Sequence, residues 1–308
     1  MKKLFTIIAA LVLPLMALAQ ESQEEFLRRY NNLVGRVGAS GVGVETLLNK
    51  WEAAYPEDPQ QLLARFSFCF DRSRESHVIQ LDRDRYLGRE PLIPYTDSLG
   101  NRKNFFEDFV YDDDLYAQAN LAIDRAIALR PSRLDYRLVK IDAMMAYEKE
   151  QPEMTLQNLK SLADKNFKEH PAWQYEGLED TVTDEQFLAF MQDYAVALFR
   201  IGSDASQEAF RAFSEYMLKY CKDDPLFTDN LGSYYLVKKD YKKAAKYFDQ
   251  VLKKHPSDMT AIQNGIILAR AKKDLKLEKK YLAHMARYGE KETDRQSAQM
   301  RLDAMGKR

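Results

Sequence analysis

Residues 225–256 constrain the fold of this chain more than any other segment. They read PLFTDNLGSYYLVKKDYKKAAKYFDQVLKKHP, which predicts a helix, a tight Asp-Tyr corner and a second helix ended by proline. The apolar side chains of the second helix recur every three or four residues and so share one face: Tyr241, Ala244, Ala245, Phe248, Val251 and Leu252. Because a helical hairpin buries only one side internally, its other side needs a neighbouring unit. The segment therefore predicts a stack of helix pairs.

This segment resembles a tetratricopeptide repeat, a helix pair of about 34 residues. The matching residues, in chain order, are Asn230, Leu231, Gly232, Tyr235, Asp240, Tyr241, Ala244, Tyr247, Phe248, Leu252 and Pro256. Gly232 and Ala244 are small where the two helix axes should cross most closely. Val251 departs from the pattern, since the family usually has another small residue there. The resemblance implies an all-α fold, a tetratricopeptide-like α-solenoid of antiparallel helix pairs.

Weaker copies of the unit flank the clear one. In the following copy, Asn264 lies one repeat after Asn230 and Leu282 one repeat after Phe248, and upstream the helix-stopping prolines Pro131 and Pro171 repeat the ending. The chain is thus divided into N-terminal helices (20–72), an insert (73–111), degenerate repeat-like helices (112–171), a helical pair with a joint (172–224), the clear repeat (225–258), a degenerate repeat (259–291) and a C-terminal capping helix (292–308).

Local signals set several helix ends. Thr183 or Asp184 should cap a helix over 185–200, with Gln186 in its first turn. A glycine-rich joint should separate a helix over 22–34 from one over 44–55, and its members are Gly35, Gly38, Gly41 and Gly43. We also expect a helix over 60–72 to pair with one over 112–130, on either side of the insert.

The first nineteen residues have a different character. Lys2 and Lys3 precede an apolar stretch that ends in Ala17-Leu18-Ala19. This order of charge, apolar run and small residues is typical of a secretory signal, here with cleavage before Gln20. We therefore expect an exported, periplasmic protein.

The insert over 73–111 lacks a helical period. HVIQL, PLIPYT and RKNFF look extended, and DSLGN looks like a turn with Gly100 and Asn101 at positive φ, so the insert could form a β-hairpin. Its arginines and tyrosines could line a site for a glycan or another small polar ligand, or for catalysis: Arg83, Arg85, Tyr86, Arg89, Tyr95 and Arg102. Alternatively, the insert is only a flap that covers a repeat end.

Motifs of the common enzyme classes are missing from the sequence. It contains no His-Glu-x-x-His zinc motif, no glycine-rich phosphate loop and no Gly-x-Ser-x-Gly elbow, and its 4 histidines are scattered. We expect no catalysis, no cofactor and no metal.

Residues 236–308 carry 19 Lys and Arg against 9 Asp and Glu. This basic segment either attracts an anionic partner or merely solvates outer helix faces, and nothing resembles a nucleic-acid motif.

The resemblance implies a scaffold that holds a protein or peptide in the concave groove formed by the first helices. The family's groove positions fall on Asp229, Asn230, Ser233 and Val237 in the clear repeat and on Gln263, Asn264, Ile267 and Arg270 in the next. The two asparagines could clamp a peptide backbone, because an amide side chain donates and accepts. Alternatively, they tighten helix packing. Asp229 stands where carboxylate-gripping members of the family have lysine, which argues against a chaperone-tail ligand.

Overall fold

The computed structural model describes residues 21–306, and the predicted signal at 1–19 lies outside this range. The described part of the chain is predominantly helical and divides into two compact units. The first unit contains α1 (Gln23–Val37), α2 (Val44–Ala54), α3 (Pro59–Ser73) and α4 (Asp113–Leu129). Its core includes Trp51, which is fully buried, stacks on Phe26 and donates its indole N–H to Asp58 at 2.9 Å.

The two helices that flank the insert in sequence pack against each other. The expected pairing of the segments at 60–72 and 112–130 is confirmed, because α3 contacts α4, with Phe70 against Tyr116. The glycine-rich joint begins later than expected. Helix α1 continues through Gly35 to Val37 because a helical glycine costs only about 1 kcal/mol relative to alanine. The chain then turns at Gly38 and Gly43, both of which have positive φ.

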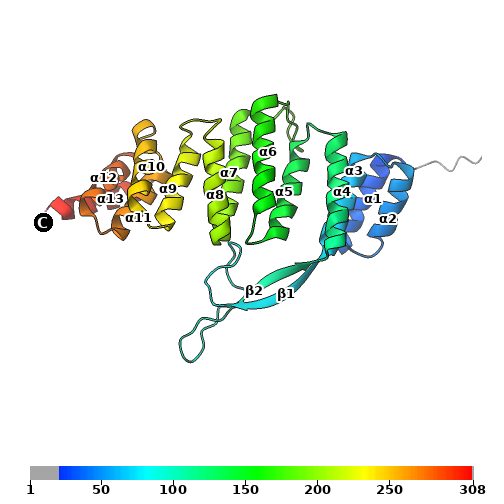
Figure 1. Cartoon of the computed structure of the whole chain (residues 1–308), viewed down its shortest axis with the longest axis horizontal. Coiled ribbons are helices and arrows are strands. Elements are labelled where there is room, and N and C mark those ends of the chain that lie inside the picture. Colours follow the sequence, from blue (N-terminus) through cyan, green and yellow to red (C-terminus); the bar gives the residue numbers. More distant parts are fainter. Residues whose placement is uncertain (1–20, 307–308) are drawn as a thin grey trace, which may run out of the picture. The chain divides into compact units, whose positions relative to one another are not determined.

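The second unit consists of a β-hairpin and a row of helices (Figure 1). The hairpin is formed by β1 (Arg74–Leu81) and β2 (Asn104–Tyr111), which pair antiparallel with Arg74 opposite Tyr111. The helices are α5 (Leu134–Glu148), α6 (Glu153–Glu169), α7 (Asp184–Ile201), α8 (Asp204–Met217), α9 (Pro225–Val237), α10 (Tyr241–Lys254), α11 (Met259–Ala271), α12 (Leu275–Tyr288) and α13 (Glu292–Gly306).

The row of helices is a tetratricopeptide-like solenoid with a small β insert, as predicted. Helices α9 and α10 form one antiparallel pair, α11 and α12 form the next, and α13 packs on α12. All four helices of these pairs begin with an aspartate whose side chain accepts a backbone N–H of the first turn: Asp224, Asp240, Asp258 and Asp274. The same cap thus recurs at each helix start in both repeats.

The glycine at the predicted helix crossing has the role expected of it. A Cβ atom on Gly232 would lie 2.4 Å from Cε1 of Phe248, and a Cβ on Gly265 would lie 2.5 Å from Cδ1 of Tyr281. In the second pair the aromatic partner is therefore Tyr281 and not Leu282, the residue that sequence alignment places one repeat after Phe248. The first and second helices thus approach closely in both pairs, but in the second pair the aromatic partner lies one position earlier than the alignment predicts.

The joint before α7 is fixed by a buried tryptophan and a capping box. Trp173 is almost fully buried and donates its indole N–H to Asn166 at 2.9 Å. Thr183 then caps α7: its hydroxyl accepts from the Gln186 N–H at 3.2 Å, and the Gln186 side chain accepts from the Thr183 N–H at 2.9 Å. The predicted cap is confirmed, with Thr183 in that role.

The turn at the tip of the hairpin differs from the prediction at one residue. Gly100 has φ +84°, as expected, whereas Asn101 is not among the residues with positive φ. The Asp97 side chain accepts from the backbone N–H of Leu99 and of Asn101, at 2.9 and 2.8 Å. This side-chain turn shapes the tip, so a second left-handed residue is not needed.

Candidate functional site

A groove lies among the last helices of the second unit, and we call it the C-terminal groove. It has a volume of about 400 Å³ and is lined by α11, α12 and α13 through Gln263, Ile266, Ile267, Arg270, Leu282, Met285, Asp294, Ser297, Ala298 and Arg301. Ile267 is 55% exposed although it is a large apolar residue. Gln263, Ile267 and Arg270 are three of the eight groove residues predicted from the sequence, and the structure brings them together here.

A buried carboxylate fixes the charged rim of this groove. Glu278 of α12 accepts from Arg270 at 2.9 Å and from Arg301 at 3.4 Å, and it is only about 3% exposed. Burial by itself would raise the pKa of Glu278, but the hydrogen bonds from the two guanidinium groups outweigh it and lower the pKa. The carboxylate is therefore ionised and holds both arginines at the groove.

The other predicted groove residues do not line this cavity. Asn230 is buried, and its amide exchanges two hydrogen bonds with Gln192 of α7, at 2.8 and 3.0 Å. Asn264 donates to the Ser233 hydroxyl of α9 at 3.1 Å. Both amides join neighbouring helices, the packing role that the sequence left as an alternative. Val237 is 50% exposed at the end of α9.

Asp229 is buried beside another carboxyl group. It is 3% exposed, and its Oδ1 has no hydrogen-bond partner. Burial, and then the neighbouring Asp258, raise the pKa of Asp229 to about 9. Since Asp258 also caps α11 through the Ala261 N–H at 2.9 Å, the pair joins the first helix of one repeat to the start of the first helix of the next.

A larger cavity lies where the hairpin meets α5 and α7, and we call it the hairpin cavity. Its volume is about 520 Å³. It is lined by Arg74, Leu87, Gly88, Arg89, Asp108, Phe109 and Tyr111 of the hairpin and by Asp142, Met145, Ala146, Lys149, Ala197, Arg200 and Ile201 of the helical row. Its wall contains both apolar and charged side chains.

The hairpin is anchored to the helices by polar contacts at the edge of this cavity. Asp108 of β2 accepts from the Tyr86 hydroxyl at 3.1 Å and from Lys149 at 2.8 Å. Burial opposes ionisation of Asp108, but the hydrogen bonds from Lys149, the Phe109 N–H and Tyr86 together outweigh it and lower its pKa. Gly88 has φ +76° and lies so near α7 that a Cβ would be 3.0 Å from Cβ of Arg200. Only glycine fits this loop without a shift.

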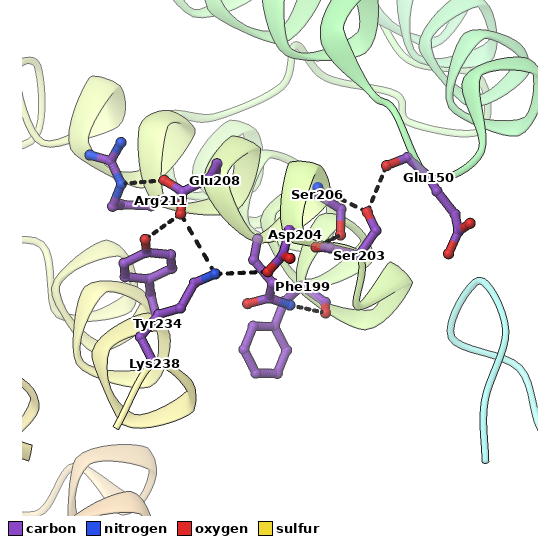
Figure 2. Close-up of polar contacts among 10 residues, drawn as sticks. Glu150, Phe199, Ser203, Asp204, Ser206, Glu208, Arg211, Tyr234 and Lys238 are labelled. Atoms are coloured by element: carbon purple, nitrogen blue, oxygen red, sulfur yellow. Dashed lines mark hydrogen bonds and ion pairs between the residues drawn. The ribbon is translucent and has the colours of Figure 1, made fainter. Parts of the chain in front are cut away.

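A network of polar contacts continues this anchorage into α8 and α9 (Figure 2). Glu150 pairs with Arg83 of the hairpin at 2.5 Å through its carboxylate, and its backbone carbonyl accepts from Ser203 at 2.6 Å. Ser203 also caps α8 by accepting from the Ser206 N–H at 3.1 Å. Farther along, Lys238 of α9 donates to Asp204 at 3.0 Å. Glu150 therefore links the hairpin to the start of α8.

The insert residues proposed from the sequence are scattered in the structure. Arg89 lines the hairpin cavity, and the buried Tyr86 supports it through Asp108. Arg85 pairs with Glu90 and Arg102 with Asp84 on exposed loops, while Tyr95 is 49% exposed. Arg74 also lines the cavity, from the first residue of β1. Asp142, Lys149 and Arg200 could not be predicted, since no local pattern shows that helices distant in sequence meet the hairpin.

Comparison with known proteins adds little to this geometry. No family model matches the chain, and no curated protein matches it. One similar solved structure is described as a functional characterization of Pseudomonas aeruginosa pilF, with 11% identity, a TM-score of 0.35 and coverage of 90% of this chain and 96% of that one. Another is PilW, described as a widely conserved type IV pilus biogenesis factor, with 10% identity, a TM-score of 0.38 and coverage of 90% and 99%. This likeness assigns no function.

Proposed function

We propose that the protein is a non-catalytic scaffold that binds an extended peptide segment of a partner protein in the C-terminal groove. The observation that carries this proposal is the exposure of Ile267 inside a groove built from a first helix of the solenoid. A large apolar side chain that is open to solvent in a concave surface is typical of a binding site.

The lining of the groove supports a peptide as the ligand. Ile266, Leu282 and Met285 supply an apolar floor, while Gln263 and Ser297 supply hydrogen-bonding groups beside it. An apolar side chain of the peptide would pack on Ile267, and the side-chain amide of Gln263 would form a hydrogen bond with the peptide backbone. The excess of lysine and arginine over 236–308 supports a partner with acidic residues around the anchor.

We propose that this binding takes place after export to the periplasm, since residues 1–19 carry the pattern of a signal peptide. Within residues 21–306, no helix is both long enough and apolar enough to cross a bilayer. No group of three or more His, Cys, Asp or Glu side chains in this range could hold a metal ion.

The proposal is tested by capture of partners with the purified chain from a periplasmic extract, followed by affinity measurements with each purified candidate. Ile267→Glu replaces the apolar contact surface with a charged side chain and should weaken binding by about 1–3 kcal/mol. Ile93→Glu is the matched control, because Ile93 is a similarly exposed isoleucine, at 60%, on the hairpin. Equal losses in both variants, or a loss in Ile93→Glu alone, would exclude the C-terminal groove as the binding site.

A further inference from the structure

In the hairpin cavity the carboxylates are paired with protein groups of residues 21–306, while one arginine is not. Its two carboxylates are already engaged: Asp108 with Lys149 and Tyr86, and Asp142 with the Tyr194 hydroxyl at 2.7 Å. The guanidinium of Arg200, by contrast, has no hydrogen bond or ion pair within the described residues. The cavity therefore offers positive charge without an equivalent free anion.

Two further arginines, Arg74 and Arg89, line the wall beside Arg200. Arg74 lies over the Phe109 ring, with its guanidinium carbon 5.4 Å from the ring centroid. The guanidinium of Arg89 is 3.8 Å from the Glu107 carboxylate, near the long limit of an ion pair, and the two side chains are 49% and 39% exposed. Arginine binds carboxylates and phosphates through two parallel N–H donors, which suits it to an anion in a partly enclosed site.

The carboxyl group of Asp142 is held in the wall of the cavity. Its side chain is accessible through the cavity, yet protein atoms surround the carboxyl group, and this burial raises its pKa. The Tyr194 hydroxyl has one proton but two acceptors within reach, Asp142 at 2.7 Å and the Leu138 carbonyl at 3.0 Å. The bond from Tyr194 stabilises the carboxylate and opposes this rise in the pKa, but burial is the larger effect.

The apolar part of the wall limits the kind of anion. Phe109, Met145 and Ile201 contribute an aromatic ring and two aliphatic surfaces to the same cavity. A bare inorganic ion would leave these surfaces wet. The volume of about 520 Å³ is that of a site for a small organic molecule.

We infer that the hairpin cavity binds a small organic anion, whose charged group is held by Arg200 and Arg74 and whose apolar body packs on Phe109 and Ile201. This site is separate from the C-terminal groove, and it uses the insert as one wall. The anchors at Asp108, Gly88 and Glu150 hold the wall in place before a ligand arrives. Pre-organisation of this kind reduces the entropy lost on binding.

The test is calorimetric titration of the purified chain with 4-phenylbutyrate and with its uncharged amide, each up to about 1 mM. Phenyl phosphate serves as a second anion with an aromatic body, and the stronger binder of the two acids identifies the preferred charged group. We expect the acid to bind roughly tenfold or more tightly than the amide. Equal binding of acid and amide, or no binding of either acid, overturns the inference.

Two arginine variants locate the binding. Arg200→Gln should weaken acid binding by roughly tenfold and leave the amide unaffected. Arg102→Gln removes the same charge from an exposed part of the hairpin outside the cavity and should bind as the unmodified chain does. If Arg200→Gln unfolds, Arg74→Gln provides the same comparison. Unchanged acid binding in the folded cavity variant, or an equal loss in Arg102→Gln, contradicts the assignment.

Discussion

At the scale of single residues, two buried carboxyl groups of the C-terminal repeats have pKa values shifted in opposite directions. Glu278 has two arginine partners, so its pKa is lowered and it remains charged. Asp229 has only another carboxyl group beside it, so burial raises its pKa to about 9. Because both side chains are almost fully buried, the difference between them comes from their neighbours, which decide whether the pKa is raised or lowered.

We predict that Asp229→Asn stabilises the protein at pH 8 by about 1–3 kcal/mol and has little effect near pH 4. The folded-state pKa of Asp229 exceeds its unfolded value, so its contribution is complete below the unfolded pKa near 3.8 and is lost as pH rises towards 9. Asparagine is neutral throughout and removes this loss. Urea unfolding at the two pH values measures the difference, and the exposed Asp193→Asn is the control. A gain that is the same at both pH values would disprove the shift.

At the scale of elements, close crossing of first and second helices defines both C-terminal repeats. Gly232 against Phe248 and Gly265 against Tyr281 leave no room for a methyl group. For the first of these contacts, the family resemblance predicted a close helix crossing at Gly232 but did not name Phe248 as the partner. It did not indicate the second, because the aromatic residue there is displaced by one position from the aligned leucine, and only packing reveals which side chain meets the glycine.

We predict that Gly232→Ala destabilises α9 and α10 by about 1–3 kcal/mol through overpacking against Phe248. Gly35→Ala is the control: Gly35 is helical, and nothing lies within 4 Å of its added Cβ, so this change should stabilise by about 0.5–1 kcal/mol. Hydrogen exchange of the helices concerned reports each effect locally. Faster exchange in α1 of Gly35→Ala, or unchanged exchange in α9 and α10 of Gly232→Ala, would contradict the packing argument.

At the scale of the whole molecule, local patterns determined most helices but few of the sites. Aspartate caps, terminal prolines and apolar spacing are local signals, so the helix pairs of the second unit could be predicted from them. The hairpin cavity depends on Lys149 and Arg200 meeting the insert, a contact between distant segments that carries no local signature. The C-terminal groove was predicted in part. The repeat pattern predicted Ile267 as a groove residue, whereas only the structure showed that Asn230 is hydrogen-bonded to Gln192.

The most direct test of the scaffold function is site-specific photo-cross-linking in the periplasm. A photoreactive amino acid replaces Ile267 in one strain and Ile93 in another, and cross-linked products are identified by mass spectrometry. Both positions are exposed, so both probes can reach solvent and neighbours equally. We predict that position 267 yields a discrete product with one partner protein, whose peptide carries acidic residues beside an apolar anchor, and that position 93 yields none with that partner. Products from position 93 with the same partner, or none from position 267, would contradict binding in the C-terminal groove.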